Sequence, residues 1–253
     1  MGRILAFAYG VACYAVFLAT FLYAIGFVSN VGVPKSIDSP PTTSLGYALL
    51  VNALLLGVFA VQHSGMARQG FKQAWTRIVP RPVERSTYVL FSSLALIILF
   101  WGWQPIGGVV WEVDNPTARL ALIALSFAGW GLVLLCTFLI NHFDLFGLRQ
   151  VWLYLVGREY KPIAFRTPAI YNYVRHPLYL GFLVAFWAAP TMTIAHLVFA
   201  LATTGYVLIA IQLEERDLMR EHPSYGEYQP RVHDHAAPPE ALSQARRRTR
   251  CMH

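Results

Sequence analysis

Residues 178–213 read LYLGFLVAFWAAPTMTIAHLVFALATTGYVLIAIQL and contain no Asp, Glu, Lys or Arg. A single transmembrane helix needs about 20 residues, so these 36 residues are too many for one span. Pro190 lies within the stretch, where a proline interrupts a helix. We therefore interpret the stretch as a helical hairpin with its tip near residues 190–193. Both ends of such a hairpin emerge on the same side of a membrane.

Four further uncharged stretches precede the hairpin. They cover residues 4–28, 45–62, 86–103 and 120–140, and each is long enough to span a bilayer as a helix. The first stretch follows Arg3, but it is long for a signal peptide and no clear cleavage site follows it, so we expect a retained helix. The sequence thus predicts an all-α integral membrane protein with four single transmembrane helices plus a helical hairpin.

The composition agrees with a membrane protein. Of the 253 residues, 56% are hydrophobic and 13% are charged, whereas soluble domains average about 25% charged residues. This excludes a disordered chain and argues against an ordinary soluble domain. The net charge of +7 is explained by basic loops, so we expect the lipid bilayer and not nucleic acid as a partner. The three cysteines are widely spaced, which argues against a disulfide framework or a thiolate zinc site.

Basic residues alternate between the loops. Loops 64–85 and 141–177 carry five each and the tail from residue 214 carries seven, against one in loop 29–44 and none in loop 104–118. Because basic loops stay in the cytoplasm, we expect the N-terminus, the two basic loops and the tail to lie there. We also expect a bacterial inner membrane as the location. Residues 1–232 are predicted to form a single membrane-embedded domain, and residues 233–253 a disordered basic tail.

Most polar residues that can carry chemistry lie on this predicted cytoplasmic side. Residues 173–181 read YVRHPLYLG and open the hairpin. Pro177 suits the first turn of a helix, which places Arg175 and His176 at a helix N-terminus that attracts anions. Gly181 allows a ligand or a neighbouring helix to approach the backbone. A basic interfacial flank with a snorkelling arginine is the alternative explanation.

A second polar segment closes the same hairpin. Residues 212–220 read QLEERDLMR and are followed by HPSYGEY at 222–228. Because the hairpin returns to the side that it left, Glu214 and Glu215 should lie near Arg175 and His176. Carboxylates beside an Arg–His pair can hold a ligand that bears both charge signs. The alternative is a solvated helix end whose charges pair with each other.

These segments carry a family resemblance. The pattern Arg-His-Pro-x-Tyr-x-Gly, followed by a hairpin and Glu-Glu-x-x-Leu, resembles the isoprenylcysteine carboxyl methyltransferase superfamily and is similar to phospholipid N-methyltransferases. HSGMAR at 63–68, ERSTYVL at 84–90, WGWQP at 101–105 and NHFDLFGLRQ at 141–150 look like the methanethiol S-methyltransferase family. That family lies in the same superfamily, beside the NnrU-like proteins.

The resemblance implies an enzyme that uses S-adenosyl-L-methionine to convert methanethiol to dimethyl sulfide. The cofactor pocket would be formed by the cytoplasmic loops and tail, with no obligatory protein partner. The cofactor-binding residues expected on this basis are Tyr173, Val174, Arg175, His176, Pro177, Tyr179, Gly181, Glu214, Glu215, Tyr225 and Tyr228.

Methyl transfer to a thiol requires the thiolate, so a base or a positive group should lie near the acceptor. His142 is the first candidate base, with Asp144 to orient it and Arg149 to help, although residues two apart need not face each other. His63 is the next candidate. We interpret His196, near the hairpin tip, as a packing residue, and we expect no metal site.

Two alternatives remain open from the sequence. One is a different acceptor for the same chemistry: a prenylated cysteine carboxylate, a phospholipid amine or another small thiol. The other is a non-enzymatic membrane accessory or transport protein like the NnrU-like relatives.

Overall fold

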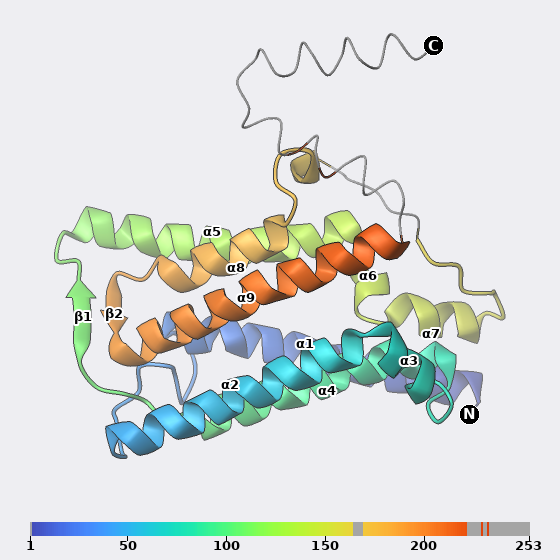
Figure 1. The fold of residues 1–253 in the computed structure, drawn as a ribbon, viewed down its shortest axis with the longest axis horizontal. Helices are drawn as coiled ribbons and strands as arrows, with labels where there is room; N and C mark the ends of the chain where they lie inside the picture. Colours follow the sequence, from blue (N-terminus) through green and yellow to red (C-terminus); the bar gives the residue numbers. More distant parts are fainter. Residues whose placement is uncertain (1, 164–168, 222–228, 230–231, 233–253) are drawn as a thin grey trace, which may run out of the picture.

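The computed structural model describes residues 2–163, 169–221, 229 and 232. Five long helices run along one common axis (Figure 1): α1 (Arg3–Ser29), α2 (Leu45–Ala67), α4 (Arg81–Gly102), α5 (Pro116–Ile140) and α9 (Ile194–Glu221). Within the described residues these five are long and apolar enough to cross a membrane. The predicted all-α integral membrane fold is therefore confirmed.

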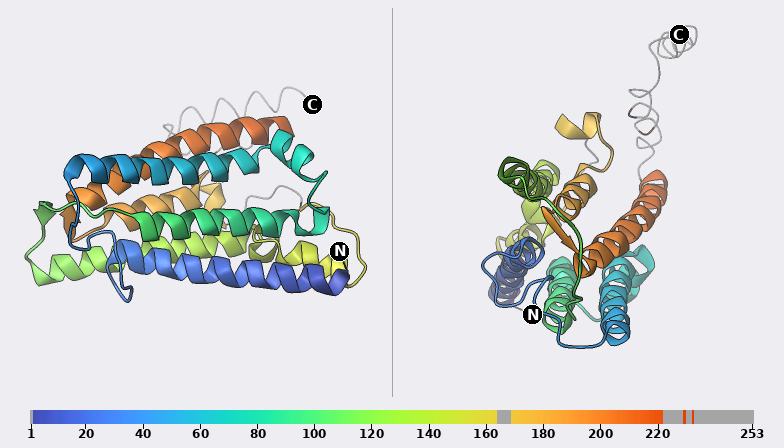
Figure 2. Two further views of the ribbon diagram at one scale, coloured as in Figure 1. Left: turned by 90° about the horizontal axis from the view of Figure 1, so that it is seen from below. Right: turned by 90° about the vertical axis from the view of Figure 1, so that its left-hand side faces the viewer.

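The helices form two layers. Seen end on in Figure 2, α4 lies between α1 and α2 in one layer, and α8 (Pro177–Trp187) lies between α5 and α9 in the other. Large apolar side chains such as Leu22, Leu54 and Leu135 remain exposed on the outside of the bundle. Exposed apolar side chains on several sides are expected where lipid surrounds the helices.

The predicted hairpin consists of α8 and α9, but its two arms differ in length. α8 has 11 residues and α9 has 28, so α8 is only about 16 Å long, roughly half the thickness of the hydrocarbon core. Pro177 begins α8 and disfavours helical backbone at His176. The first residue of α8 consequently lies part-way along the bundle, and not at its end (Figure 1).

Two short strands close one end of the bundle and were not predicted. β1 (Val109–Glu112) pairs antiparallel with β2 (Thr191–Thr193) of the hairpin tip. The indole nitrogen of Trp111 also donates a hydrogen bond to the Ala189 carbonyl at 3.1 Å. The strands satisfy backbone groups that the chain exposes where it turns between helices. They tie the hairpin tip to the loop between α4 and α5.

The opposite end of the bundle carries the short helices. These are α3 (Gln69–Trp75), α6 (His142–Leu145) and α7 (Leu148–Leu155), and the N-terminus lies beside them (Figure 1). α7 packs closely on α1, where the Val151 side chain occupies the space beside Gly10. A Cβ at Gly10 would lie only 2.5 Å from that side chain. The short helices α3, α6 and α7, which belong to the two basic loops, thus share one end of the bundle with the N-terminus, as the charge pattern predicts.

Candidate active site

The first cluster of polar side chains joins the start of α8 to the end of α9. Arg175 Nη1 lies 2.9 Å and His176 Nε2 lies 3.0 Å from Oε1 of Glu215. The side-chain amide of Gln229 donates to the other Glu215 oxygen at 3.1 Å. Three donors therefore already satisfy this carboxylate, whose side chain is only 16% exposed. The predicted meeting of the two hairpin segments is present in the structure.

The neighbouring carboxylate, Glu214, is in a different state. It accepts a hydrogen bond from the Tyr179 hydroxyl at 2.9 Å and lies 3.9 Å from Nδ1 of His176. Its side chain is 46% exposed. Among the described residues, Glu214 thus accepts fewer hydrogen bonds than Glu215 and is more exposed, so it has more capacity to accept hydrogen bonds from a cationic ligand.

The remaining residues of the predicted cofactor set lie in several environments. Tyr173 is 74% exposed, Val174 is half-buried and Pro177 is buried. A Cβ at Gly181 would lie 2.9 Å from the Gly129 carbonyl oxygen of α5, so this glycine serves helix packing and does not face an opening. Tyr225 and Tyr228 lie outside the described residues.

A second polar cluster lies between α2 and α4. His63 Nδ1 is 3.1 Å from the Ser92 hydroxyl and 3.1 Å from the Tyr88 hydroxyl. One residue further along α2, the Ser64 hydroxyl lies 2.9 Å from the Tyr206 hydroxyl of α9. The region around His63 is therefore tied to α9, the helix that also carries Glu214.

His142 begins α6, directly after the end of α5, and is only 3% exposed. Its Nδ1 lies 2.8 Å from the Thr137 hydroxyl and its Nε2 lies 2.8 Å from the Tyr14 hydroxyl. The Phe138 ring stacks on the imidazole with the centroids 4.2 Å apart. Burial lowers the pKa of His142 below its ordinary value, because removal from water disfavours the imidazolium. The lowered pKa favours the neutral ring at neutral pH.

Asp144 does not contact the His142 ring nitrogens. Its carboxylate accepts hydrogen bonds from Arg149 at 2.7 Å and from the Tyr160 hydroxyl at 3.3 Å. Burial and the nearby Asp144 charge raise the pKa of Tyr160, so the phenol stays protonated. Asp144 and Arg149 therefore brace the loop, and Thr137 and Tyr14 take the orienting role that was predicted for Asp144.

Sequence analysis did not single out Tyr14 and Thr137. Both lie inside apolar helices, α1 and α5, where a tyrosine or threonine is common and carries no motif. The available signal was that Thr137 precedes His142 by about one helical turn, close enough to bond it. No sequence signal pairs Tyr14 with a residue 128 positions away.

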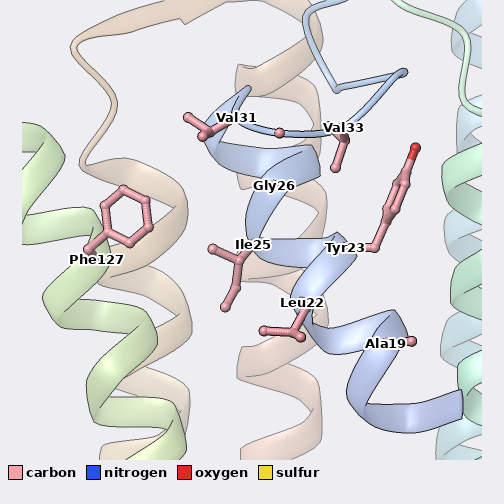
Figure 3. Close-up of a pocket in the computed structure, with 9 residues that line it drawn as sticks. Ala19, Leu22, Tyr23, Ile25, Gly26, Val31, Val33 and Phe127 are labelled. Carbon is pink, nitrogen blue, oxygen red and sulfur yellow. The ribbon is translucent and has the colours of Figure 1, made fainter. Parts of the chain in front are cut away.

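An apolar groove on the outer surface lies away from these clusters. It is bordered by α1, the loop after it and Phe127 of α5 (Figure 3). Its lining includes Leu22, Ile25 and Val31 and is apolar apart from Tyr23. Within the described chain, no three His, Cys, Asp or Glu residues gather as metal ligands would.

The fold and the clusters together define a polytopic helical membrane protein with a cluster of charged side chains where α8 begins and α9 ends. No protein-family profile and no solved structure matches the chain. It is 55% identical over 233 residues to a methanethiol S-methyltransferase of Crocosphaera subtropica, covering 92% of this chain and 91% of the relative. It is 56% identical over 219 residues to that of Mycobacterium tuberculosis, covering 87% and 90%. The chain belongs to the methanethiol S-methyltransferase family.

A more distant similarity extends to animals. The nurim protein of Mus musculus is 32% identical over 173 residues, which covers 65% of each chain.

Proposed function

We propose that this protein transfers a methyl group from S-adenosyl-L-methionine to methanethiol and thereby forms dimethyl sulfide. The observation that carries the proposal is the meeting of Glu214 and Glu215 with Arg175, His176 and Tyr179 across one hairpin. The relatives that share more than half of their residues with this chain support the choice of acceptor.

The donor set of this cluster fits the amino-acid end of S-adenosylmethionine. Glu214 is partly exposed and can accept hydrogen bonds from the ammonium group. Arg175 uses one N–H on Glu215 and has further N–H groups for the ligand carboxylate. The bound cofactor would supply a sulfonium methyl group, and the faces of neighbouring tyrosines such as Tyr179 suit its positive charge.

The acceptor requires a place where a small apolar thiol can lose its proton. His142 is surrounded by aromatic rings, including Phe138 and Phe146, and is held neutral, so that it can accept a proton. His63 offers a second imidazole near Tyr88. We propose that His142 is the base and that Arg149 and Asp144 hold the loop that carries it.

The site is proposed to face the cytoplasm of a bacterial inner membrane. Glu214 and Glu215 lie close to the C-terminal end of α9. That end of α9 points toward the bundle end that carries α6, α7 and the N-terminus (Figure 1). Basic loops remain on the cytoplasmic side during insertion.

Calorimetric titration of the detergent-purified protein with S-adenosylmethionine tests the proposal. We expect saturable binding of S-adenosylmethionine. We also expect the same protein to produce dimethyl sulfide when methanethiol is added. Absence of binding would overturn the proposal in favour of an accessory protein. Binding combined with methylation of a phospholipid or a prenylcysteine, and not of methanethiol, would replace the acceptor.

A further inference from the structure

The hydrogen bonds around His142 determine where its proton lies. The Thr137 hydroxyl is 2.7 Å from the Leu134 carbonyl oxygen and 2.8 Å from Nδ1 of His142. A carbonyl oxygen only accepts, so the single hydroxyl proton of Thr137 points to Leu134. Thr137 must therefore accept a hydrogen bond from the imidazole, and Nδ1 of His142 carries a proton.

The neutral imidazole then has its lone pair on Nε2. Because that nitrogen lies 2.8 Å from the Tyr14 hydroxyl, Tyr14 donates a hydrogen bond to His142. The Tyr14 oxygen keeps its own lone pairs available. The Tyr14 ring is half-buried and packs near Phe17 and Phe146, which provide apolar walls.

Charged groups do not compete for this imidazole within the described residues. On the same loop, Asp144 and Arg149 bond each other. On α4, Arg85 donates through Nε to the Leu145 carbonyl at 2.7 Å and lies over the Tyr88 ring. Within the described residues, the chain Thr137–His142–Tyr14 is thus a hydrogen-bonded relay that ends at the half-buried Tyr14 side chain.

We propose that Tyr14 is a catalytic residue that takes the proton of the acceptor thiol and passes its own proton to His142. This inference rests on the proposed function and assigns the group that touches the thiol. Thr137 is a positioning residue that fixes the imidazole with Nε2 toward Tyr14.

The step balances without an oxidant or a reductant. The S–H bond of the thiol breaks as an O–H bond forms on Tyr14, and the former phenolic proton moves to Nε2 of His142. The electron pair left on the thiol sulfur forms the bond to the donor methyl, and the bond between that methyl and the donor sulfur breaks. The resulting imidazolium keeps its Nδ1 proton on Thr137 and returns the other proton to water by way of Tyr14.

Kinetics of Tyr14→Phe test the relay. A general base contributes about 10²–10⁴-fold, so we expect kcat to fall at least a hundredfold with little change in KM for the methyl donor. The remaining rate should rise about tenfold per pH unit, because it depends on thiol that ionises without help. Tyr23→Phe is the matched control, since Tyr23 lies on the same helix and donates only to the Lys35 carbonyl.

Nitrogen-15 NMR of histidine-labelled protein supplies a readout other than activity. The signals lost in His142→Phe identify His142, and we expect a neutral ring protonated at Nδ1. The Nε2 signal should move in Tyr14→Phe, which removes the donated hydrogen bond. A ring protonated at Nε2 in the wild-type protein would overturn the proposal, whatever the activity.

Two variants of Thr137 test whether its hydroxyl positions the His142 ring or only stabilises the fold. Thr137→Ser keeps the hydroxyl and should retain wild-type turnover and the Nδ1–H form, whereas Thr137→Val should lose both.

Equal pH profiles for wild type and Tyr14→Phe, with an active wild type, would contradict the relay and leave the proposed function standing. An inactive wild type that also fails to bind S-adenosylmethionine would contradict the proposed function itself.

Discussion

Glu214 and Glu215 are adjacent in the sequence but occupy different environments. Glu215 is held by Arg175 and His176, while Glu214 is half exposed and accepts one hydrogen bond from Tyr179. A largely buried carboxylate that pairs with a guanidinium and an imidazole contributes to stability mainly because its removal leaves those groups unpaired. A half-exposed carboxylate with spare capacity is suited to a ligand.

Glu214→Gln and Glu215→Gln should therefore differ in kind. We expect Glu214→Gln to weaken S-adenosylmethionine binding about tenfold to a hundredfold, since a hydrogen bond to a charged group contributes about 1.5–3 kcal/mol. Glu215→Gln should weaken binding indirectly, because it loosens the hold on Arg175 and His176. Glu215→Gln should also lower the thermal unfolding midpoint, whereas Glu214→Gln should not. Calorimetry and thermal melts measure the two effects, with Glu112→Gln at the far end of the bundle as the control. Wild-type affinity in both variants would refute the assignment.

The buried neutral state of His142 has a consequence for stability in acid. Its pKa in the folded protein lies below the ordinary value of 6.5, so below pH 6.5 the unfolded chain binds more protons than the folded one. Its contribution to stability is present above pH 6.5 and is lost as the pH falls through the folded pKa. The unfolding midpoint of wild type should thus fall more steeply than that of His142→Phe between pH 7 and 5. Parallel curves would show that His142 takes no proton on unfolding.

At this scale the sequence predicted part of the site and missed the rest for a physical reason. The meeting of Arg175 and His176 with Glu215 follows from a hairpin that returns to its starting side. The contact of Tyr14 with His142 depends on the rotation of α1 about its axis, which no local pattern fixes. Asp144 was placed with His142 by proximity in sequence, yet its side chain bonds Arg149.

At the scale of elements, α8 is positioned by its contact with α5. A Cβ at Gly129 would lie 2.6 Å from the Ala185 nitrogen and 2.7 Å from the Gly181 carbonyl oxygen. Real Cβ atoms do not approach backbone so closely, so the two helices touch because both positions are glycine. The Ser126 hydroxyl adds a hydrogen bond to the Ala185 carbonyl at 2.9 Å.

Gly129→Ala should separate α5 from α8 and move His176 relative to Glu215. We expect a lower unfolding midpoint and weaker S-adenosylmethionine binding from this single methyl group. Gly131→Ala, on the same helix, meets nothing within 4 Å and should be neutral or stabilising, because alanine favours a helix by about 1 kcal/mol over glycine. Identical melts for the two variants would show that the helix contact is loose.

The elements themselves were predicted unevenly. Long uncharged stretches identify α1, α2, α4, α5 and the hairpin, because the length of a span is set by the bilayer. The 11-residue length of α8 and the pairing of β1 with β2 depend on contacts between distant segments. Hydropathy alone cannot show either feature.

The whole molecule is polarised along its axis. The C-terminal end of α9, α6, α7 and the N-terminus lie toward one end, and the two strands close the other (Figure 1). The loops at the first end carry five basic residues each, against one and none in the loops at the other end. By the positive-inside rule, this asymmetry predicts that the first end faces the cytoplasm.

Reporter fusions test the orientation. The two reporters are a fluorescent protein that folds in the cytoplasm and alkaline phosphatase, which is active only outside it. We expect the fluorescent protein to be active after residue 232 and alkaline phosphatase to be inactive there. We expect the reverse for reporters inserted in residues 105–116. A cytoplasmic signal from residues 105–116 would reverse the placement of the site.

The most direct test of the account follows the methyl group itself. Purified protein in proteoliposomes is given S-adenosylmethionine with a trideuterated methyl group and unlabelled methanethiol, and the headspace is analysed by mass spectrometry. The account predicts dimethyl sulfide that carries one trideuterated methyl, formed by wild type and by Glu112→Gln and strongly reduced in Glu214→Gln. Unlabelled dimethyl sulfide, or none from a protein that binds S-adenosylmethionine, would contradict it.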